Sequence, residues 1–158
     1  MTNSELDIQE RKIRGQGGDD VITHFSTGIV VLNNNKVLMV RREPNDFLGG
    51  NWELPGGGID EGETFKEGLT RELAEETGLK VKDIIGIFKG FDYTNEKHRV
   101  RQVNFLVTTT TLDITLSHEH DAFLWVGSND LGNITMTKEM LKCVKNAINI
   151  ADKKAISK

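Results

Sequence analysis

The most informative stretch of the chain, residues 57–79, reads GGIDEGETFKEGLTRELAEETGL. Its opening glycines allow the backbone positive φ angles and a close approach to an anion or a metal ion. The residues that follow predict a helix from Thr64 to Thr77, because Thr64 and Glu67 have the spacing of a capping box and Gly78 suits the left-handed position that ends a helix. A glycine-rich loop therefore runs directly into a helix with well-marked ends.

Three glutamates of this predicted helix, Glu72, Glu75 and Glu76, stand at positions i, i+3 and i+4 and so share one side of it. Leu69 and Leu73 lie on the adjoining stripe, which places the carboxylates at the border of the buried face. An acidic helix face is usually only solvated surface. Two carboxylates about 4 Å apart, however, repel by about 4 kcal/mol at an effective dielectric constant near 20, so a partly buried cluster favours a cation. Oxygen ligands of this kind suit Mg²⁺ or Mn²⁺.

The loop and the helix also keep a fixed spacing: Gly57, five residues, Glu63, seven residues, and then the run from Arg71 to Leu79. At these residues the sequence resembles the Nudix box at every defined position of that motif, and so resembles the Nudix hydrolase family of MutT-like proteins. The resemblance implies an α+β fold, the Nudix-type α/β/α sandwich, in which helices flank a mixed β-sheet.

The resemblance also implies roles for individual residues. Catalytic and metal-binding roles fall on Glu72, Glu75 and Glu76, with the carbonyl of Gly56 as a backbone ligand and Mg²⁺ or Mn²⁺ as the cofactor. Glu72 is also a candidate general base. Glu63 and Arg71 are expected to give structural support, because their charge pairing would hold the loop against the helix and keep the metal ligands oriented.

A fourth carboxylate is expected from residues 116–127, LSHEHDAFLWVG, which begin as a polar loop and enter a strand. The Ser-x-Glu-His pattern followed by a Trp resembles the corresponding stretch of many Nudix hydrolases, so Glu119 is predicted as a further catalytic and metal-binding residue. The alternative is that Glu119 is a surface charge near the start of a strand. His118 and His120 suggest zinc by their spacing, but a single distant cysteine and no second histidine pair favour a loop role for both.

The rest of the chain reads as one domain of strands and helices. Strands are expected at residues 24–32, 36–42, 52–54, 81–91, 98–111 and 123–126, and a last helix at 137–151. Residues 1–20 are polar and lack a sustained period, so they are predicted to form an N-terminal arm or an edge segment. Residues 21–158 are predicted to form the single Nudix hydrolase domain.

The charge, the cysteine count and the apolar runs of the chain disfavour several kinds of partner and cellular location. With 24 acidic and 20 basic side chains in 158 residues, the formal charge is −4, which lacks the basic surplus that duplex nucleic acid would require. The single cysteine cannot form an internal disulfide, the start lacks the pattern of a signal peptide, and no apolar run approaches the roughly 18 residues of a membrane span. We therefore expect a cytoplasmic protein with no membrane partner. The oligomeric state stays open, a homodimer included.

The resemblance implies hydrolysis of a diphosphate linkage, in which metal ions neutralise the phosphate oxygens and activate water. The expected small nucleotide substrate is a nucleoside diphosphate linked to another group or a nucleoside triphosphate, including one with an oxidised purine. One alternative is a dinucleoside polyphosphate hydrolase, which the sequence Leu54-Pro55-Gly56-Gly57 disfavours, since those enzymes usually carry Pro-Pro-Lys-Gly there. Another is a non-catalytic module that senses nucleotides or binds proteins, which the intact glutamates disfavour. Candidate substrate contacts are Arg41, Arg42, Arg99 and Arg101 for phosphates and Phe91 and Tyr93 for a base.

Overall fold

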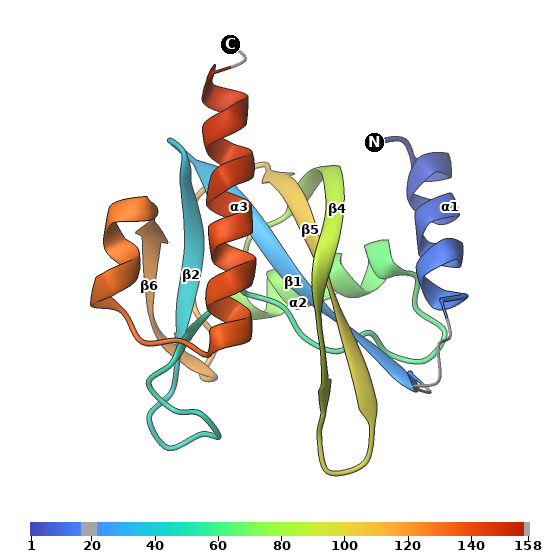
Figure 1. Ribbon diagram of the computed structural model, residues 1–158, viewed down its shortest axis with the longest axis horizontal. Coiled ribbons are helices and arrows are strands. Elements are labelled where there is room, and N and C mark those ends of the chain that lie inside the picture. The colour runs from blue at the N-terminus through green and yellow to red at the C-terminus, as the bar shows by residue number, and fades with distance from the viewer. Residues whose placement is uncertain (17–21, 157–158) are drawn as a thin grey trace.

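The computed structural model of the chain describes residues 1–16 and 22–156 (Figure 1). Its strands are β1 (His24–Asn33), β2 (Lys36–Arg42), β3 (Trp52–Glu53), β4 (Val81–Thr94), β5 (Arg99–Thr109) and β6 (His120–Val126). Its helices are α1 (Asn3–Arg14), α2 (Phe65–Thr77), α3 (Lys138–Ile156) and the short 3₁₀ helix η1 (Ser128–Asn133).

The six strands form a mixed sheet in the order β3-β2-β1-β5-β4, with β6 also paired to β2. Strands β1 and β5 run parallel, from the pair His24 and Val100 to the pair Val31 and Val107. The other pairings are antiparallel. The predicted α+β sandwich, a mixed sheet flanked by helices, is confirmed.

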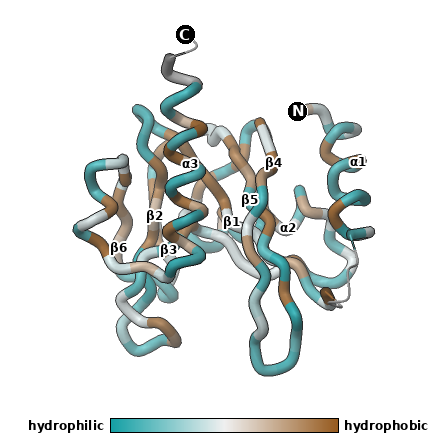
Figure 2. The backbone as a smooth tube through the Cα atoms, in the orientation of Figure 1, coloured by the Kyte–Doolittle hydropathy of each residue, from teal (hydrophilic) through white to brown (hydrophobic). Residues whose placement is uncertain are grey.

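Strand β1 lies near the centre of the fold, with α2 and α3 on opposite sides of the sheet (Figure 1). Ile29 and Val31 pack with Phe65 of α2, whereas Val30 packs with Val144 of α3. Because both faces of β1 are covered, its apolar run is continuous instead of alternating. Figure 2 shows hydrophobic residues along β1 and β2, and hydrophilic residues at the tip of the β4–β5 hairpin.

Helix α2 has the ends that the sequence predicts. Thr64 caps its first turn by accepting a hydrogen bond from the backbone N–H of Glu67, and the Glu67 side chain completes the capping box. Gly78, with φ of +71°, ends the helix in the left-handed conformation. Helix α2 therefore begins just after the glycine loop and ends just before β4. Local sequence signals largely set both ends.

The N-terminal segment corrects one prediction, because residues 3–14 form helix α1 instead of an irregular arm or an edge segment. A capping box of Thr2 and Glu5 begins this helix, and the side chain of Leu6, 3% exposed, joins the core on the α2 side of the sheet. The sequence did carry the capping signal, but a single buried leucine gave no apolar period to support it.

Helix α1 also contacts the start of α2. The carboxylate of Glu10 accepts a hydrogen bond from the backbone N–H of Phe65, in the first turn of α2. The guanidinium of Arg14 lies 4.7 Å from the centre of the Phe65 ring and donates to the backbone carbonyl of Glu63 at 3.1 Å. These contacts tie α1 to the loop that precedes α2.

Among the described residues, no helix combines the length and the apolar character that crossing a bilayer requires.

Truncation of Leu6 tests whether α1 is part of the folded domain. Leu6→Ala is expected to lower the free energy of unfolding by about 2–4 kcal/mol, since it removes a buried side chain. Ile8→Ala is the matched control, because Ile8 lies on the same helix with 58% exposure and should change stability by less than about 0.5 kcal/mol. Urea denaturation measures both, and equal stabilities of the two variants would contradict the docking of α1.

Candidate functional site

An acidic pocket of about 310 Å³ lies between the glycine loop, α2 and the loop that enters β6. The side chains of Glu53, Glu72, Glu76 and Glu119 line it, together with residues 56–58. These carboxylates come from β3, α2 and the chain just before β6, so the fold assembles the pocket from segments far apart in the sequence.

Glu76 is the most buried carboxylate of the acidic pocket, with only 5% of the residue exposed. Burial, with a smaller contribution from the nearby carboxylates of Glu53, Glu72 and Glu119, raises its pKa to about 8. The backbone N–H of Gly56 opposes this by donating to Oε2 of Glu76 at 2.9 Å. At neutral pH this group therefore holds a proton unless a cation binds beside it.

Glu72 lies against the glycine loop. Burial raises its pKa, and the guanidinium of Arg71, which donates to Oε1 of Glu72 at 2.9 Å, opposes that shift. A Cβ atom at Gly57 would clash with the carboxylate of Glu72. A side chain at position 57 would therefore require this carboxylate to move away from the loop.

Arg71 connects the helix to the loop. Its guanidinium donates to both carboxylate oxygens of Glu63, at 2.9 and 2.8 Å, and to the backbone carbonyl of Gly58 at 3.0 Å. The bonds from Arg71 lower the pKa of Glu63 to about 2, so this pair stays ionised. Arg71 and Glu63 lie where charge pairing can hold the glycine loop, which is the supporting position that the sequence predicted for them.

Glu75 differs from the other two glutamates of α2. Its side chain is 58% exposed and pairs with Arg71 at 3.3 Å, outside the lining of the acidic pocket. The structure thus brings Glu72 and Glu76 together in the pocket and leaves Glu75 at its outer side.

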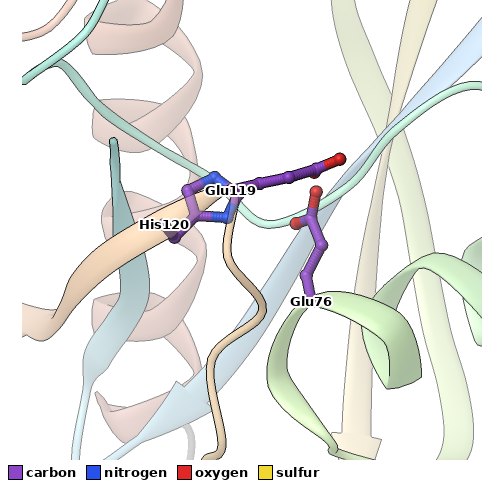
Figure 3. A group of neighbouring side chains, drawn as sticks. All are labelled: Glu76, Glu119 and His120. Atoms are coloured by element: carbon purple, nitrogen blue, oxygen red, sulfur yellow. The ribbon is translucent and has the colours of Figure 1, made fainter. Parts of the chain in front are cut away.

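The first residue of β6, His120, and the residue before it, Glu119, also lie at this site. Glu119, which the sequence analysis predicted as a further catalytic and metal-binding residue, lines the acidic pocket, although its side chain is exposed. His120 corrects a prediction, because it is a buried residue at the first position of β6 and not a loop residue. Its Nε2 lies 2.9 Å from Oε1 of Glu53. Figure 3 shows the carboxylates of Glu76 and Glu119 beside each other, with the ring of His120 next to them. A ligand atom of each of the three residues lies within 4.8 Å of the others.

Glu53 was missed by the sequence analysis. It lies in the two-residue strand β3 beside buried Trp52, and Nη1 of Arg42 donates to it at 3.1 Å. An acidic residue between two apolar ones, just before a Pro-Gly loop, was the available signal. The place of Glu53 beside His120 depends on the pairing of β2 with β3 and β6, which joins residues about 70 positions apart.

The six predicted substrate contacts separate into three groups. Arg42 and Tyr93 line the acidic pocket, while Phe91 and Arg101 line a larger cleft of about 1010 Å³ over β4, β5 and α3. Gln102 lines both spaces, so the cleft adjoins the pocket. Arg41, which pairs with Asp121 at 2.7 Å, and Arg99, which donates to Thr94 at 3.1 Å, line neither of these two spaces.

The donor set fits a divalent cation. Four carboxylates, one of them nearly buried with a raised pKa, supply oxygen ligands and negative charge in excess of the nearby arginines. A bound cation would relieve the repulsion among them and favour the ionised form of Glu76.

Comparison with known proteins places the chain in a family. A family model described as the NUDIX domain matches residues 22–147. The chain is 32% identical over 126 residues to an RNA pyrophosphohydrolase of Pelagibacter ubique, covering 68% of this chain and 77% of that protein. It is 38% identical over 79 residues to an ADP-ribose pyrophosphatase of Methanocaldococcus jannaschii, covering 49% of this chain and 46% of that protein. The match therefore spans about half the length of the second relative.

A solved structure agrees in fold. The MutT protein from Methanosarcina mazei Go1 superposes with a TM-score of 0.68 at 26% identity, covering 84% of this chain and 94% of that one.

The raised pKa of Glu76 predicts how stability depends on pH. Between the ordinary pKa of 4.5 and about 8, the folded protein keeps a proton on Glu76 that the unfolded chain has lost, so stability falls as pH rises through this range. In metal-free protein, Glu76→Gln removes this cost and keeps an acceptor for the N–H of Gly56. We expect the variant to exceed the wild type by several kcal/mol near pH 8 and to match it near pH 4.5.

Urea denaturation at several pH values, with a chelator present, measures this difference. Glu75→Gln is the matched control, since Glu75 lies on the same helix but is mostly exposed, and its effect should stay within about 0.5 kcal/mol at every pH. A Glu76→Gln difference that does not grow with pH would contradict the placement of this carboxylate.

Proposed function

The chain belongs to the Nudix family, and we propose that its acidic pocket hydrolyses a diphosphate linkage in a small nucleotide with the help of Mg²⁺ or Mn²⁺. The observation that carries the proposal is the convergence of Glu53, Glu72, Glu76 and Glu119 around one pocket beside a glycine loop. Nudix hydrolases generally use a divalent metal, and this donor set suits one.

We assign metal binding to Glu72, Glu76 and Glu119, with the carbonyl of Gly56 as a backbone ligand. Glu75 would join them only after its pair with Arg71 opens. When bound, the metal ion neutralises phosphate oxygens and lowers the pKa of water. Arg71 and Glu63 keep the glycine loop fixed against α2, so the ligands of the loop and the helix hold one geometry.

A carboxylate of the pocket must accept the proton of the attacking water. Glu72 and Glu119 are the candidates, because Glu76 is buried and already accepts from Gly56. Glu72 forms an ion pair with Arg71, which stabilises the ionised carboxylate and so makes Glu72 a weaker base. Glu119, whose exposed carboxylate has no hydrogen-bond or ion-pair partner among the described residues, suits proton transfer to solvent.

The adjoining cleft supports a nucleotide substrate. Phe88 and Phe91 offer aromatic surface for a base, and Gln102 marks the junction with the acidic pocket. We propose a nucleoside diphosphate linked to another group, or a nucleoside triphosphate, with the scissile phosphates in the pocket. The relatives named above are an ADP-ribose pyrophosphatase and an RNA pyrophosphohydrolase, and the first of these names supports a linked diphosphate. Residues 21–158 would form the catalytic domain, with α1 packed on it.

Metal removal tests the proposed activity. Turnover of a panel containing ADP-ribose, nucleoside triphosphates and 5′-triphosphorylated RNA should require Mg²⁺ or Mn²⁺ and disappear with a chelator. Release of a nucleoside monophosphate with pyrophosphate marks a triphosphate substrate, whereas a monophosphate with a phosphorylated second group marks a linked diphosphate. Unchanged turnover after thorough metal removal would refute the proposal.

Glu119→Gln tests the role of the carboxylate before β6. We expect kcat to fall at least about 100-fold with little change in KM, since the interaction strengthens in the transition state. The melting temperature should hardly change, because the side chain is exposed. Asp113→Asn, an exposed acid of the same segment outside the acidic pocket, is the control and should keep wild-type kinetics. A Glu119→Gln kcat within about twofold of wild type, less than about 0.5 kcal/mol of barrier, would remove Glu119 from the site.

A further inference from the structure

We propose that Glu76, Glu119 and His120 form a mixed oxygen and nitrogen metal site, which binds a first-row transition ion such as Mn²⁺, Co²⁺ or Zn²⁺ in preference to Mg²⁺. The inference rests on the proposed metal centre but not on the identity of its substrate. It differs from the sequence-based expectation, in which all ligands were oxygen atoms.

The first observation is the burial of an imidazole with an unused nitrogen. The side chain of His120 is 2% exposed. Its Nδ1 is buried and has no hydrogen-bond partner among the described residues. A buried polar atom of this kind is uncommon in folded proteins, and a ligand is one of the ordinary reasons for it.

The second observation is the way that the ring is held. Nε2 of His120 lies 2.9 Å from Oε1 of Glu53, and Nη1 of Arg42 fixes the same oxygen at 3.1 Å. Because a carboxylate accepts hydrogen bonds, this contact places a ring proton on Nε2, and in the neutral ring that can bind a metal ion the lone pair is then on Nδ1. Histidines that bind metal ions usually have their second ring nitrogen held by a carboxylate or a carbonyl in this way.

The third observation is the approach of two carboxylates. Ligand atoms of Glu76, Glu119 and His120 all lie within 4.8 Å of one another (Figure 3). Bonds of about 2.0–2.2 Å to one metal ion place neighbouring ligand atoms about 3–3.5 Å apart. The exposed side chain of Glu119 can supply the approach that remains, because Glu76 and His120 are both buried.

The nitrogen ligand sets the metal preference. Mg²⁺ prefers an octahedron of oxygen atoms, whereas imidazole suits the later transition ions. The remaining carboxylates of the acidic pocket, those of Glu53 and Glu72, do not change this preference, because oxygen ligands serve both classes of ion.

Spectroscopy of bound Mn²⁺ tests the site without reference to turnover. After the protein of 158 residues has been freed of metal and then loaded with Mn²⁺, pulsed EPR should detect coupling to one ¹⁴N nucleus of an imidazole. His120→Gln should abolish that coupling and weaken Mn²⁺ binding about 10-fold to 100-fold in calorimetric titrations, with less than about a threefold effect on Mg²⁺. His118→Gln is the matched control, because His118 is an exposed neighbour and its loss should change neither quantity.

The outcomes separate this inference from the proposed function. Mn²⁺ binding without nitrogen coupling, or full Mn²⁺ affinity in His120→Gln, would overturn the nitrogen ligand and leave the proposed hydrolase standing. Failure of the wild type to bind any divalent ion would overturn both. If His120→Gln does not fold, as judged by circular dichroism, the wild-type spectrum alone decides, since it requires no variant.

Discussion

The carboxylate of Glu76 lies where water cannot stabilise its charge, and the rest of the site is arranged around that constraint. Burial raises its pKa to about 8, and three further carboxylates border the same pocket. A folded chain retains such a cluster at a cost in stability, because like charges in a partly buried place repel one another. Binding of a divalent cation relieves this repulsion, and the relief contributes to the free energy of binding. A metal centre therefore explains the cluster better than a solvated acidic surface does.

The surrounding elements keep this cluster in place. The guanidinium of Arg71 joins α2 to the glycine loop through Glu63 and Gly58, and helix α1 reaches the same loop through Arg14. On the opposite side, Arg42 of β2 holds Glu53, which in turn holds the ring of His120. The pocket therefore lies between two arginine-centred networks, one built by local sequence and one built by strand pairing.

That division also explains how much could be predicted from the sequence. The ends of α2, its glutamates and the fold class followed from spacing, capping residues and a family resemblance, all of which are local signals. Glu53 and His120 could not be found in this way, because their meeting depends on β2 pairing with both β3 and β6. The exposure of Glu75 does not follow from its spacing, because the packing of α2 against the sheet decides which of its glutamates line the pocket. Helix α1 was missed because its docking depends on Leu6 and on contacts with residues about 50 positions away.

The central claim is that the acidic pocket is a divalent metal centre built on Glu76. Anomalous diffraction from crystals grown with Mn²⁺ tests it most directly, because the signal locates the ion without any assumption about activity. The account predicts a peak within about 2.0–2.4 Å of a Glu76 carboxylate oxygen. A Mn²⁺ peak elsewhere on the protein, with none beside Glu76, would contradict it.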